Sequence, residues 1–386
     1  MSVRKRRWIT STGEAREAWL VDYNVDGKRC FETFEKKKDA DARHAQLKVD
    51  VKAGKLVAAA KKSTVASAAA AWIESAASDG LTRSTIDQYK QHVDQHILPF
   101  LGQLKLSEVS VPVVSEFKEV LRKNKRSPAM VRKVMVSLGT LLAHAQEKGL
   151  AGHNAVRDLR RNRKKKDAQA EKRKKTKLKV GVDIPLPSEI KDILANAKGR
   201  WRPLLVSAAF TGLRASELRG LRWMDVDLKT REIHVRQRAD RYNKIDVPKS
   251  EAGQRTVPIG EHVAGVLLGW QVKSGGRGHG LVFPNGRGNI ENHGNIINRG
   301  LIPAQLAAGI TTQGKAKYTG MHALRHFYAS WLINREADGG LGLPPKIVQT
   351  RMGHANLAIT MDRYGHLFPS GDDGKAQTAA EGWLLG

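Results

Sequence analysis

The sequence predicts a mostly α-helical protein with small β-sheets, an α+β fold divided into several domains. Three observations support this prediction. Apolar residues recur at helical spacing over long stretches, as at Ile86, Tyr89 and Val93. Two alternating runs flank Asp26-Gly27 near the N-terminus, which is a β-hairpin pattern. The chain has 386 residues, of which 40% are hydrophobic, so it is long enough to bury two or three cores.

Residues 1–62 are predicted to form a small β-sheet followed by one polar helix that ends near Gly54. The unit is too small for an enzyme core, but it carries a run of basic residues that we interpret as part of a DNA-binding module: Arg4, Lys5, Arg6 and Arg7. The alternative interpretation is a solvated basic tail.

Residues 63–160 are predicted to form a bundle of four or five helices, a domain type with no chemistry of its own. The segment "SPAMVRKVMVSLGTLLAHAQEKGL" places its apolar side chains on one helical face and ends at Gly149. That face consists of Val131, Val134, Leu138, Leu141, Leu142 and Ala145.

Residues 161–180 are predicted to be a linker, because they hold eleven basic and two acidic residues and almost no apolar side chains. Cations in such a segment can lie along DNA phosphates and release counterions. A solvated charge run without a ligand is the alternative. The candidate DNA-binding residues here are Arg161, Arg163, Lys164, Lys165, Lys166, Lys172, Arg173, Lys174 and Lys175.

Residues 181–370 are predicted to be a large mixed α/β domain, followed by a tail at 371–386. The clear β-region is "REIHVRQRADRYNKIDVPKSEAGQRTVPI", in which Lys249 is expected at the tip of a hairpin. The tail ends in an apolar cluster of Trp383, Leu384 and Leu385. We expect this cluster to dock on a second copy of the chain, or else to fold back on its own domain.

The formal charge is +29, from 67 Lys+Arg against 38 Asp+Glu. Such a charge favours a polyanionic partner, with nucleic acid first and an anionic membrane surface as the weaker choice. No hydrophobic run approaches the length of a membrane span, and no signal peptide is expected. The lone Cys30 excludes an intrachain disulfide and a cysteine-based zinc site. We therefore expect a cytoplasmic protein, associated with the nucleoid of a bacterial host cell.

Two segments of the large domain carry candidate site residues at helical spacing. In "FTGLRASELRGLRWMDVDL", Arg214 begins a helix and Glu217 lies on the same face three residues on. An ordinary surface ion pair is the alternative. In "GMHALRHFYASWL", His322 and Arg325 share a face.

The spacing of His322 and His326 also resembles that of zinc ligands. The metal interpretation is weak, because a zinc hydrolase motif carries Glu after the first histidine, where this chain has Ala323, and Arg325 would place a cation beside the metal.

The stretch "RMGHANLAITMDRYGHLFP" contains His354 and Tyr364. Of the six tyrosines, Tyr89 and Tyr328 are expected in cores, and Tyr242 and Tyr318 lack a matching histidine. Tyr364 follows a Gly-His pair in a polar segment, which favours it as a nucleophile.

The order and context of these residues resemble the tyrosine recombinase family, the phage-type integrases. The motifs that carry the resemblance are "TGLRASELRGLRWMDVD", "PKSEAGQRTVPI", "HALRHFYASWL" and "GHANLAITMDRYGHL". It covers residues 181–370. The bundle resembles the family's core-binding domain, and residues 1–62 resemble the arm-binding domain of integrases that contact two classes of DNA site.

The resemblance implies a role for each candidate residue. Arg214 and Arg325 clamp the scissile phosphate, and Lys249 is the general acid. His322 and His354 assist at the phosphate, Glu217 supports the site, and Tyr364 is the nucleophile. Two departures stand out: Met352 replaces the usual Leu, and the loop at 334–345 is longer than the common pattern.

Tyrosine-based DNA cleavage is chemically consistent with these residue types. Two arginines offer bidentate donors to a phosphodiester, and a lysine can protonate the leaving 5′-oxygen. The product is a 3′-phosphotyrosine, which retains the bond energy, so no cofactor is expected. No acidic cluster suited to paired magnesium ions is evident, and no metal site is predicted.

We therefore expect an integrase of a phage or mobile element that acts as a homotetramer on double-stranded DNA with core-type and arm-type sites. A host DNA-bending protein and a directionality factor are further expected partners. The alternatives are a DNA-relaxing enzyme resembling type IB topoisomerases, and a DNA-binding protein without catalytic activity.

Overall fold

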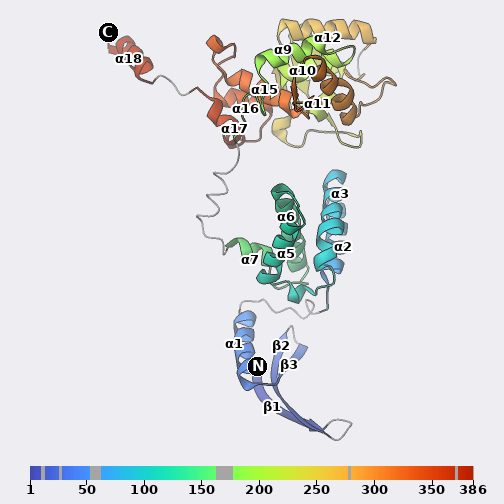
Figure 1. The fold of residues 1–386 in the computed structure, drawn as a ribbon, viewed down its shortest axis with the longest axis vertical. Coiled ribbons are helices and arrows are strands. Elements are labelled where there is room, and N and C mark those ends of the chain that lie inside the picture. Colours follow the sequence, from blue (N-terminus) through green and yellow to red (C-terminus); the bar gives the residue numbers. More distant parts are fainter. Residues whose placement is uncertain are drawn as a thin grey trace. The chain divides into compact units, whose positions relative to one another are not determined.

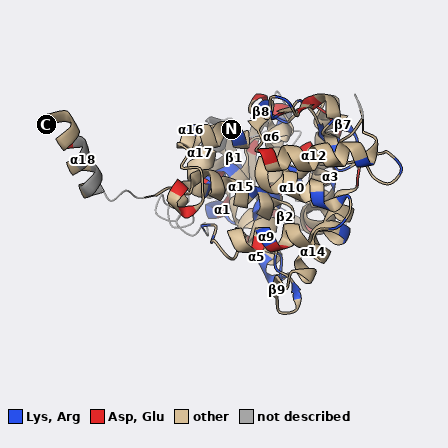
Figure 2. Ribbon diagram, turned by 90° about the horizontal axis from the view of Figure 1, so that it is seen from above, with Lys and Arg blue, Asp and Glu red and all other residues tan. Residues whose placement is uncertain are grey.

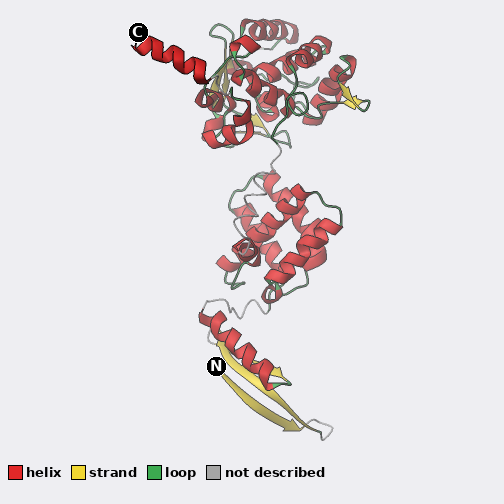
Figure 3. Cartoon of the chain, turned by 60° about the vertical axis from the view of Figure 1, so that its left-hand side comes forward, coloured by secondary structure: helices red, strands yellow, loops and turns green. Residues whose placement is uncertain are grey.

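The computed structural model of the chain divides into two compact units, Met1–Lys174 and Lys175–Gly386. Both are mainly helical with small antiparallel sheets, so the predicted fold class is confirmed (Figures 1 and 3). The residues that the structure describes are 1–9, 14–25, 28–52, 62–161, 177–276, 280–369 and 373–385.

The chain begins with a three-stranded antiparallel sheet in the order β1-β2-β3. Its strands are β1 (Ser2–Ile9), β2 (Ala15–Val25) and β3 (Lys28–Phe34), and helix α1 (Lys37–Lys52) follows. The predicted hairpin corresponds to β2 and β3, whereas β1 is an additional strand whose many basic side chains obscure its alternation in the sequence. The predicted turn residues Asp26 and Gly27 lie outside the described residues.

A small core joins this sheet to α1. It consists of Val21, Tyr23, Ala40 and Leu47, all buried. Because side chains alternate across a strand, Val3 faces the same side as its partner Val21, and so do Lys5 and Arg7. Arg4 and Arg6 therefore lie on the opposite face of β1. The four basic residues predicted as one group are divided between the two faces of the sheet.

The helical bundle follows, and its predicted apolar face is confirmed: the six residues from Val131 to Ala145 named for it are all buried. Ser127 caps the N-terminus of helix α6 (Pro128–Glu147), and its side chain accepts a hydrogen bond from the Met130 N–H. The elements are α2 (Val65–Ser78), α3 (Arg83–His92), a π-helical segment (Val93–Ile97), α4 (Leu98–Leu101), α5 (Val111–Lys123), α6 (Pro128–Glu147) and α7 (Ala155–Arg161).

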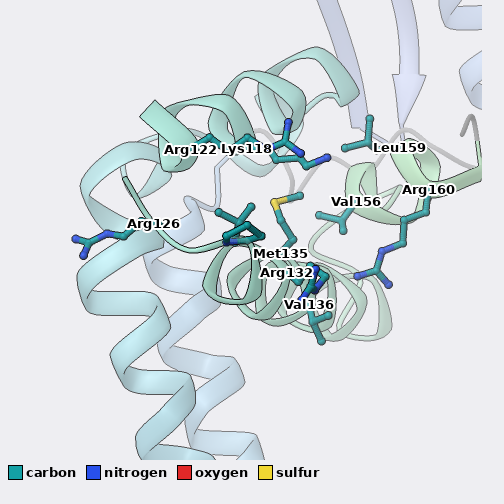
Figure 4. A pocket seen from close by; sticks show the side chains of 11 residues that line it. Lys118, Arg122, Arg126, Arg132, Met135, Val136, Val156, Leu159 and Arg160 are labelled. Carbon is teal, nitrogen blue, oxygen red and sulfur yellow. The ribbon is translucent and has the colours of Figure 1, made fainter. Parts of the chain in front are cut away.

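A pocket of about 420 Å³ lies among α5, α6 and α7. Figure 4 shows Met135 and Val156 within it and the cationic side chains of Lys118, Arg132 and Arg160 around it. The bundle therefore presents a concave surface with an apolar floor and a basic rim.

The second unit is built around one large core. Helix α10 (Trp201–Thr211) is buried along most of its length and lies among α9, α11, α12 and α15 (Figure 1). The other helices are α9 (Pro187–Asn196), α11 (Ala215–Gly220), α12 (Glu261–Ser274), α13 (His293–Asn295), a π-helical segment (Ile296–Leu301), α14 (Ile302–Ala307), α15 (His322–Ile333), α16 (Pro345–Met352), α17 (Leu357–Tyr364) and α18 (Asp373–Leu385).

The β-region of this unit pairs differently from the prediction. The expected hairpin around Lys249 is wrong, because the strands on either side of it do not pair with each other. Strand β8 (Arg255–Pro258) pairs with β5 (Glu232–Val235), which also pairs with β4 (Val226–Asp227). A separate ribbon of β6 (Arg238–Ala239) and β7 (Ile245–Asp246) lies between β5 and β8 in the sequence. A second ribbon is formed by β9 (Thr311–Thr312) and β10 (Lys315–Ala316).

The long loop at 334–345 folds back on helix α15. The indole N–H of Trp331 donates to Gly339 O at 3.0 Å, and the Leu343 N–H donates to Leu332 O at 2.8 Å. Gly339 takes a left-handed conformation with φ of 76°. The additional residues thus pack against the C-terminal half of α15, away from His322 at its start.

Basic residues are spread over many elements of the chain (Figure 2). In the parts that the structure describes, we find no helix whose length and apolar character would let it cross a bilayer. Helix α18 exposes the apolar side chains at its end, with Trp383 at 86%, Leu384 at 74% and Leu385 at 82% exposure.

Candidate active site

Arg214 lies just before α11, at the point where the chain leaves α10. Gly212 ends α10 in a left-handed conformation with φ of 60°, and a Cβ there would meet the Tyr328 ring at 2.2 Å. Glu217 accepts from the Arg214 backbone N–H at 2.8 Å and from its Nη1 at 2.7 Å. The predicted contact of Arg214 with Glu217 is present, and it fixes the direction of the guanidinium.

Glu217 has a second cationic partner that the sequence analysis missed. Arg255, at the start of β8, contacts the Glu217 carboxylate at 3.0 Å, and both side chains are 3% exposed. Its Nε also donates to Arg351 O at 2.8 Å. Burial opposes ionisation of Glu217, but the charges of Arg255 and Arg214 outweigh burial and hold its pKa below the ordinary value. Glu217 is therefore a carboxylate that holds two arginines together.

Arg325 lies on α15 and is 3% exposed. Its two terminal nitrogens donate to Gly212 O and Met352 O. Arg214 Nη2 donates to the next carbonyl, Gly353 O, at 2.9 Å. The two arginines are thus anchored on neighbouring carbonyls of one turn, the end of α16. Burial, together with the charge of Arg214, lowers the pKa of Arg325 to about 9, so it remains a cation at neutral pH.

Tyr364 is the last residue of α17 and is 1% exposed. Its hydroxyl lies 2.7 Å from His326 Nδ1, and this hydrogen bond joins α17 to α15. Burial raises the pKa of Tyr364, although Arg325 and Arg363 act in the opposite direction. The sequence indicates His326 only as half of a zinc-ligand spacing, and the one local signal for its contact with Tyr364 is its position next to Arg325.

His354 follows Gly353 and is 8% exposed. Its ring is parallel to that of Tyr364, with 6.3 Å between the ring centres. His354 Nδ1 lies 2.9 Å from Thr360 Oγ1, on the same helix as Tyr364 and one turn before it. This contact ties the histidine to the helix that carries the tyrosine.

The buried histidines of the cluster are neutral at physiological pH. Burial lowers the pKa of His326 and of His354 to about 3 each, and neighbouring positive charges add to the shift. Each ring therefore has one nitrogen with a proton and one with a lone pair. In this state the histidines donate and accept single hydrogen bonds without adding charge to the arginines.

His322 and Lys249 are placed less tightly than the other candidates. His322 is exposed at the start of α15, and its ring meets the His326 ring edge-on, with 4.9 Å between centres. Lys249 is exposed in the segment between β7 and β8. We find no hydrogen bond or ion pair of its side chain to any described residue.

The zinc interpretation of the histidine pair has no further support. Within the described ranges no group of three or more His, Cys, Asp or Glu residues is arranged to hold a metal ion. His326 Nδ1 is instead engaged with Tyr364.

The candidate DNA-binding residues outside this domain are only partly described. Arg161 is exposed at the end of α7, and Arg4, Lys5, Arg6 and Arg7 lie on β1. The remaining linker candidates lie outside the described residues: Arg163, Lys164, Lys165, Lys166, Lys172, Arg173, Lys174 and Lys175.

Comparisons with known proteins match both the helical bundle and the large domain. The model of the phage integrase family matches residues 186–370, and the model of the phage integrase central domain matches residues 65–162. A tyrosine recombinase XerC-like protein of Caldanaerobacter subterraneus is 30% identical over 206 residues, which cover 47% of this chain and 49% of that protein. The chain thus spans about half the length of the curated relatives it matches.

The solved structures that share the fold include two integrases. The Tn1549 transposon integrase in complex with transposon right end DNA superposes with a TM-score of 0.62 at 20% identity, covering 84% of this chain and 100% of that one. The lambda integrase tetramer bound to a Holliday junction gives a TM-score of 0.56 at 15% identity, covering 91% and 95%. These structures show the fold, and the two family models confirm the resemblance seen in the sequence: the chain belongs to the phage integrase family of tyrosine recombinases.

Proposed function

We propose that this protein is a site-specific DNA recombinase, an integrase that cuts and rejoins DNA through a covalent 3′-phosphotyrosine intermediate. The observation that carries the proposal is the convergence of Arg214, Arg325, His354 and Tyr364 on one another from separate elements. A buried tyrosine beside two anchored arginines is suited to attack on a phosphodiester.

The arginines would bind the scissile phosphate. Each guanidinium has five N–H donors, and the carbonyls of residues 212, 352 and 353 together with Glu217 occupy only part of them. The remaining donors are available to the nonbridging oxygens, where negative charge increases during attack. Backbone carbonyls hold both guanidinium groups, and the Glu217 carboxylate also holds that of Arg214. The two arginine side chains therefore need little reorganisation when the phosphate binds.

The chemical step would use Tyr364 as the nucleophile. The phenol gives its proton to solvent water, its oxygen bonds to phosphorus, and the bond from phosphorus to the 5′-oxygen breaks. We assign Lys249 as the acid that protonates this oxygen, and its exposed, unanchored position implies that bound DNA orders the segment between β7 and β8. His322 and His354 would donate to the phosphate. Reversal by another strand's 5′-hydroxyl completes strand exchange without a cofactor.

We further propose that the DNA contacts are divided among the domains. The bundle and the linker would bind the core-type site, and residues 1–62 would bind an arm-type site. Strand exchange needs four cleavages, one for each tyrosine, so the active form would be a homotetramer on two sites. The protein would integrate and excise a phage or mobile element, with a host DNA-bending protein and a directionality factor as partners. It would act in the cytoplasm of a bacterium, associated with the nucleoid.

The decisive experiment uses a nicked core-site duplex that traps the covalent intermediate. The wild-type protein should form a DNA adduct that survives denaturation, and Tyr364→Phe should form none while still binding DNA, because only the hydroxyl is lost. Tyr328→Phe is a matched control, since Tyr328 is also buried and lies on α15. An adduct from Tyr364→Phe would contradict the assignment.

The same substrate separates the alternatives. A DNA-binding protein without catalytic activity gives no adduct, whereas both enzyme classes give one. Exchange between two defined sites identifies a recombinase, and relaxation of supercoiled DNA that has no such site identifies a topoisomerase-like enzyme.

A further inference from the structure

The hydrogen bond between His326 and Tyr364 is not accounted for by any of the roles proposed above. His326 is 9% exposed, Tyr364 is 1% exposed, and the 2.7 Å contact between Nδ1 and the phenol oxygen is between two buried groups. A buried hydroxyl without a partner is costly, so this bond determines which way the phenol points.

The position of His326 in the sequence gives the bond a second consequence. His326 follows Arg325 directly, and both are on α15. Adjacent residues of a helix point about 100° apart, so α15 directs Arg325 toward the carbonyls of Gly212 and Met352 and directs His326 toward Tyr364. One rigid helix therefore holds both the residue that would bind the phosphate and the partner of the residue that would attack it.

We infer that His326 is a positioning residue for Tyr364, which sets the nucleophile relative to the phosphate-binding arginines through its Nδ1 hydrogen bond. This inference rests on the proposed function, because it assumes that Tyr364 attacks the phosphate. His326 itself does not touch the DNA in this scheme. It acts by holding the phenol oxygen in one place.

The surroundings of His326 favour a role in orienting the Tyr364 hydroxyl over a role as a base that accepts its proton. The ring packs edge-on against His322 on one side and at 63° to Tyr364 on the other. The pKa of His326 is lowered to about 3, mainly by burial, which makes the ring a weak base and keeps it neutral. A neutral ring can hold the hydroxyl as donor or as acceptor, and either arrangement fixes the phenol.

Three substitutions of His326 test whether a polar atom at the position of Nδ1 is needed for the cleavage rate. His326→Asn keeps a polar atom at the position of Nδ1, His326→Gln moves it to the position of Nε2, and His326→Leu removes it while filling similar space. Single-turnover adduct formation on the nicked substrate at saturating protein is the readout. We expect His326→Leu and His326→Gln to slow cleavage on the order of 10-fold, and His326→Asn to stay within about 3-fold of the wild type.

The protein concentration that half-saturates the substrate should be the same for all three variants, since none removes a DNA contact. A purely structural role would lower the melting temperature but leave the saturating rate of the folded protein unchanged. Wild-type rates for His326→Leu, or equal rates for the Asn and Gln variants, would overturn the inference.

A melting-temperature cycle tests the contact without relying on catalysis. His326→Leu should lower the melting temperature less in the Tyr364→Phe background than in the wild type, because the bond is already gone. Equal losses in both backgrounds would show that the bond does not form. If the wild-type protein gives no adduct, the proposed function fails, and this cycle still decides whether His326 holds Tyr364.

Discussion

Arg325 and Arg6 are both basic residues that we place in a DNA-binding protein, but their surroundings differ. Arg325 is 3% exposed, and its terminal nitrogens donate to two backbone carbonyls. Arg6 is exposed on strand β1, and no hydrogen bond or ion pair of its side chain is found in the described part of the chain. The guanidinium of Arg325 is therefore held in one orientation, whereas that of Arg6 can change its orientation to contact a ligand.

This difference separates two uses of positive charge. A reaction needs donors already fixed where charge develops, because their reorganisation would add to the barrier. Affinity for a DNA backbone needs only neutralisation of phosphates and release of counterions, which mobile side chains provide. The buried cluster of the second unit is thus suited to chemistry, and the outer face of the N-terminal sheet is suited to binding.

The largest expected effect comes from breaking the anchored cluster. Arg214→Ala and Arg325→Ala should each slow cleavage of the nicked substrate by about 100-fold or more, as loss of one preorganised donor does in other active sites. DNA binding should persist, because the chain has 67 Lys+Arg residues and each variant removes only one of them. Arg335→Ala is the matched control: its side chain is 63% exposed and pairs only with Asp338 among the described residues. A wild-type rate from either cluster variant would show that the anchored arginines are not used.

Acid should weaken the buried cluster before it affects exposed charges. His326 and His354 have pKa values of about 3 in the folded protein, against about 6.5 in an unfolded chain. The unfolded state therefore binds more protons, and stability is lost as pH falls from about 6.5 toward 3. We expect each histidine to cost about 1–2 kcal/mol at pH 5 relative to pH 7.5.

Urea unfolding of the wild type and of a His326→Asn/His354→Asn double variant at the two pH values measures this loss. The difference between the two proteins removes the contribution of the other histidines, including those of the bundle. The same pH dependence in both proteins would mean that the two rings are not buried in solution.

The smallest expected effect is a difference in the salt dependence of DNA binding between variants on the two faces of strand β1. Lys5 and Arg7 both pair with Glu17, at 2.7 and 3.1 Å, on the face that α1 covers. Arg4 and Arg6 lie on the other face, together with the 62% exposed Phe31. Arg4 makes only a long ion pair there, at 3.7 Å to Asp22, and no ion pair of Arg6 is found among the described residues. Basic side chains on one face are a feature of nucleic-acid-binding surfaces, and an exposed aromatic ring beside them offers a base a surface to stack on.

Arg4→Ala/Arg6→Ala should reduce the slope of log affinity against log salt by about 1–2, and Lys5→Ala/Arg7→Ala by less than 1. The two double variants lose the same formal charge, so each controls for the other. Binding of a long duplex over a range of salt concentrations gives both slopes. Equal slopes would mean that the sheet does not bind DNA through one face.

Much of the local structure was predictable because it depends on neighbours in the sequence. The apolar face of α6 and the contact of Arg214 with Glu217 follow from spacings of three or four residues along a helix. Strand β1 and the pairing of β5 with β8 were not predicted, since strand partners are chosen by packing and not by adjacent residues.

The sequence by itself determined which residue types are present, their order, and the helices that carry them, and this was enough to identify the family. The tertiary structure decided which atoms meet. Arg255 reaches Glu217 across 38 residues, Arg325 reaches Gly212 across 113, and His326 reaches Tyr364 across 38. Such contacts depend on how separate helices pack around a common core, and a hydrogen bond forms only within a few tenths of an ångström of its ideal length. The packing of the whole domain sets these interatomic distances, so no local pattern in the sequence can predict them.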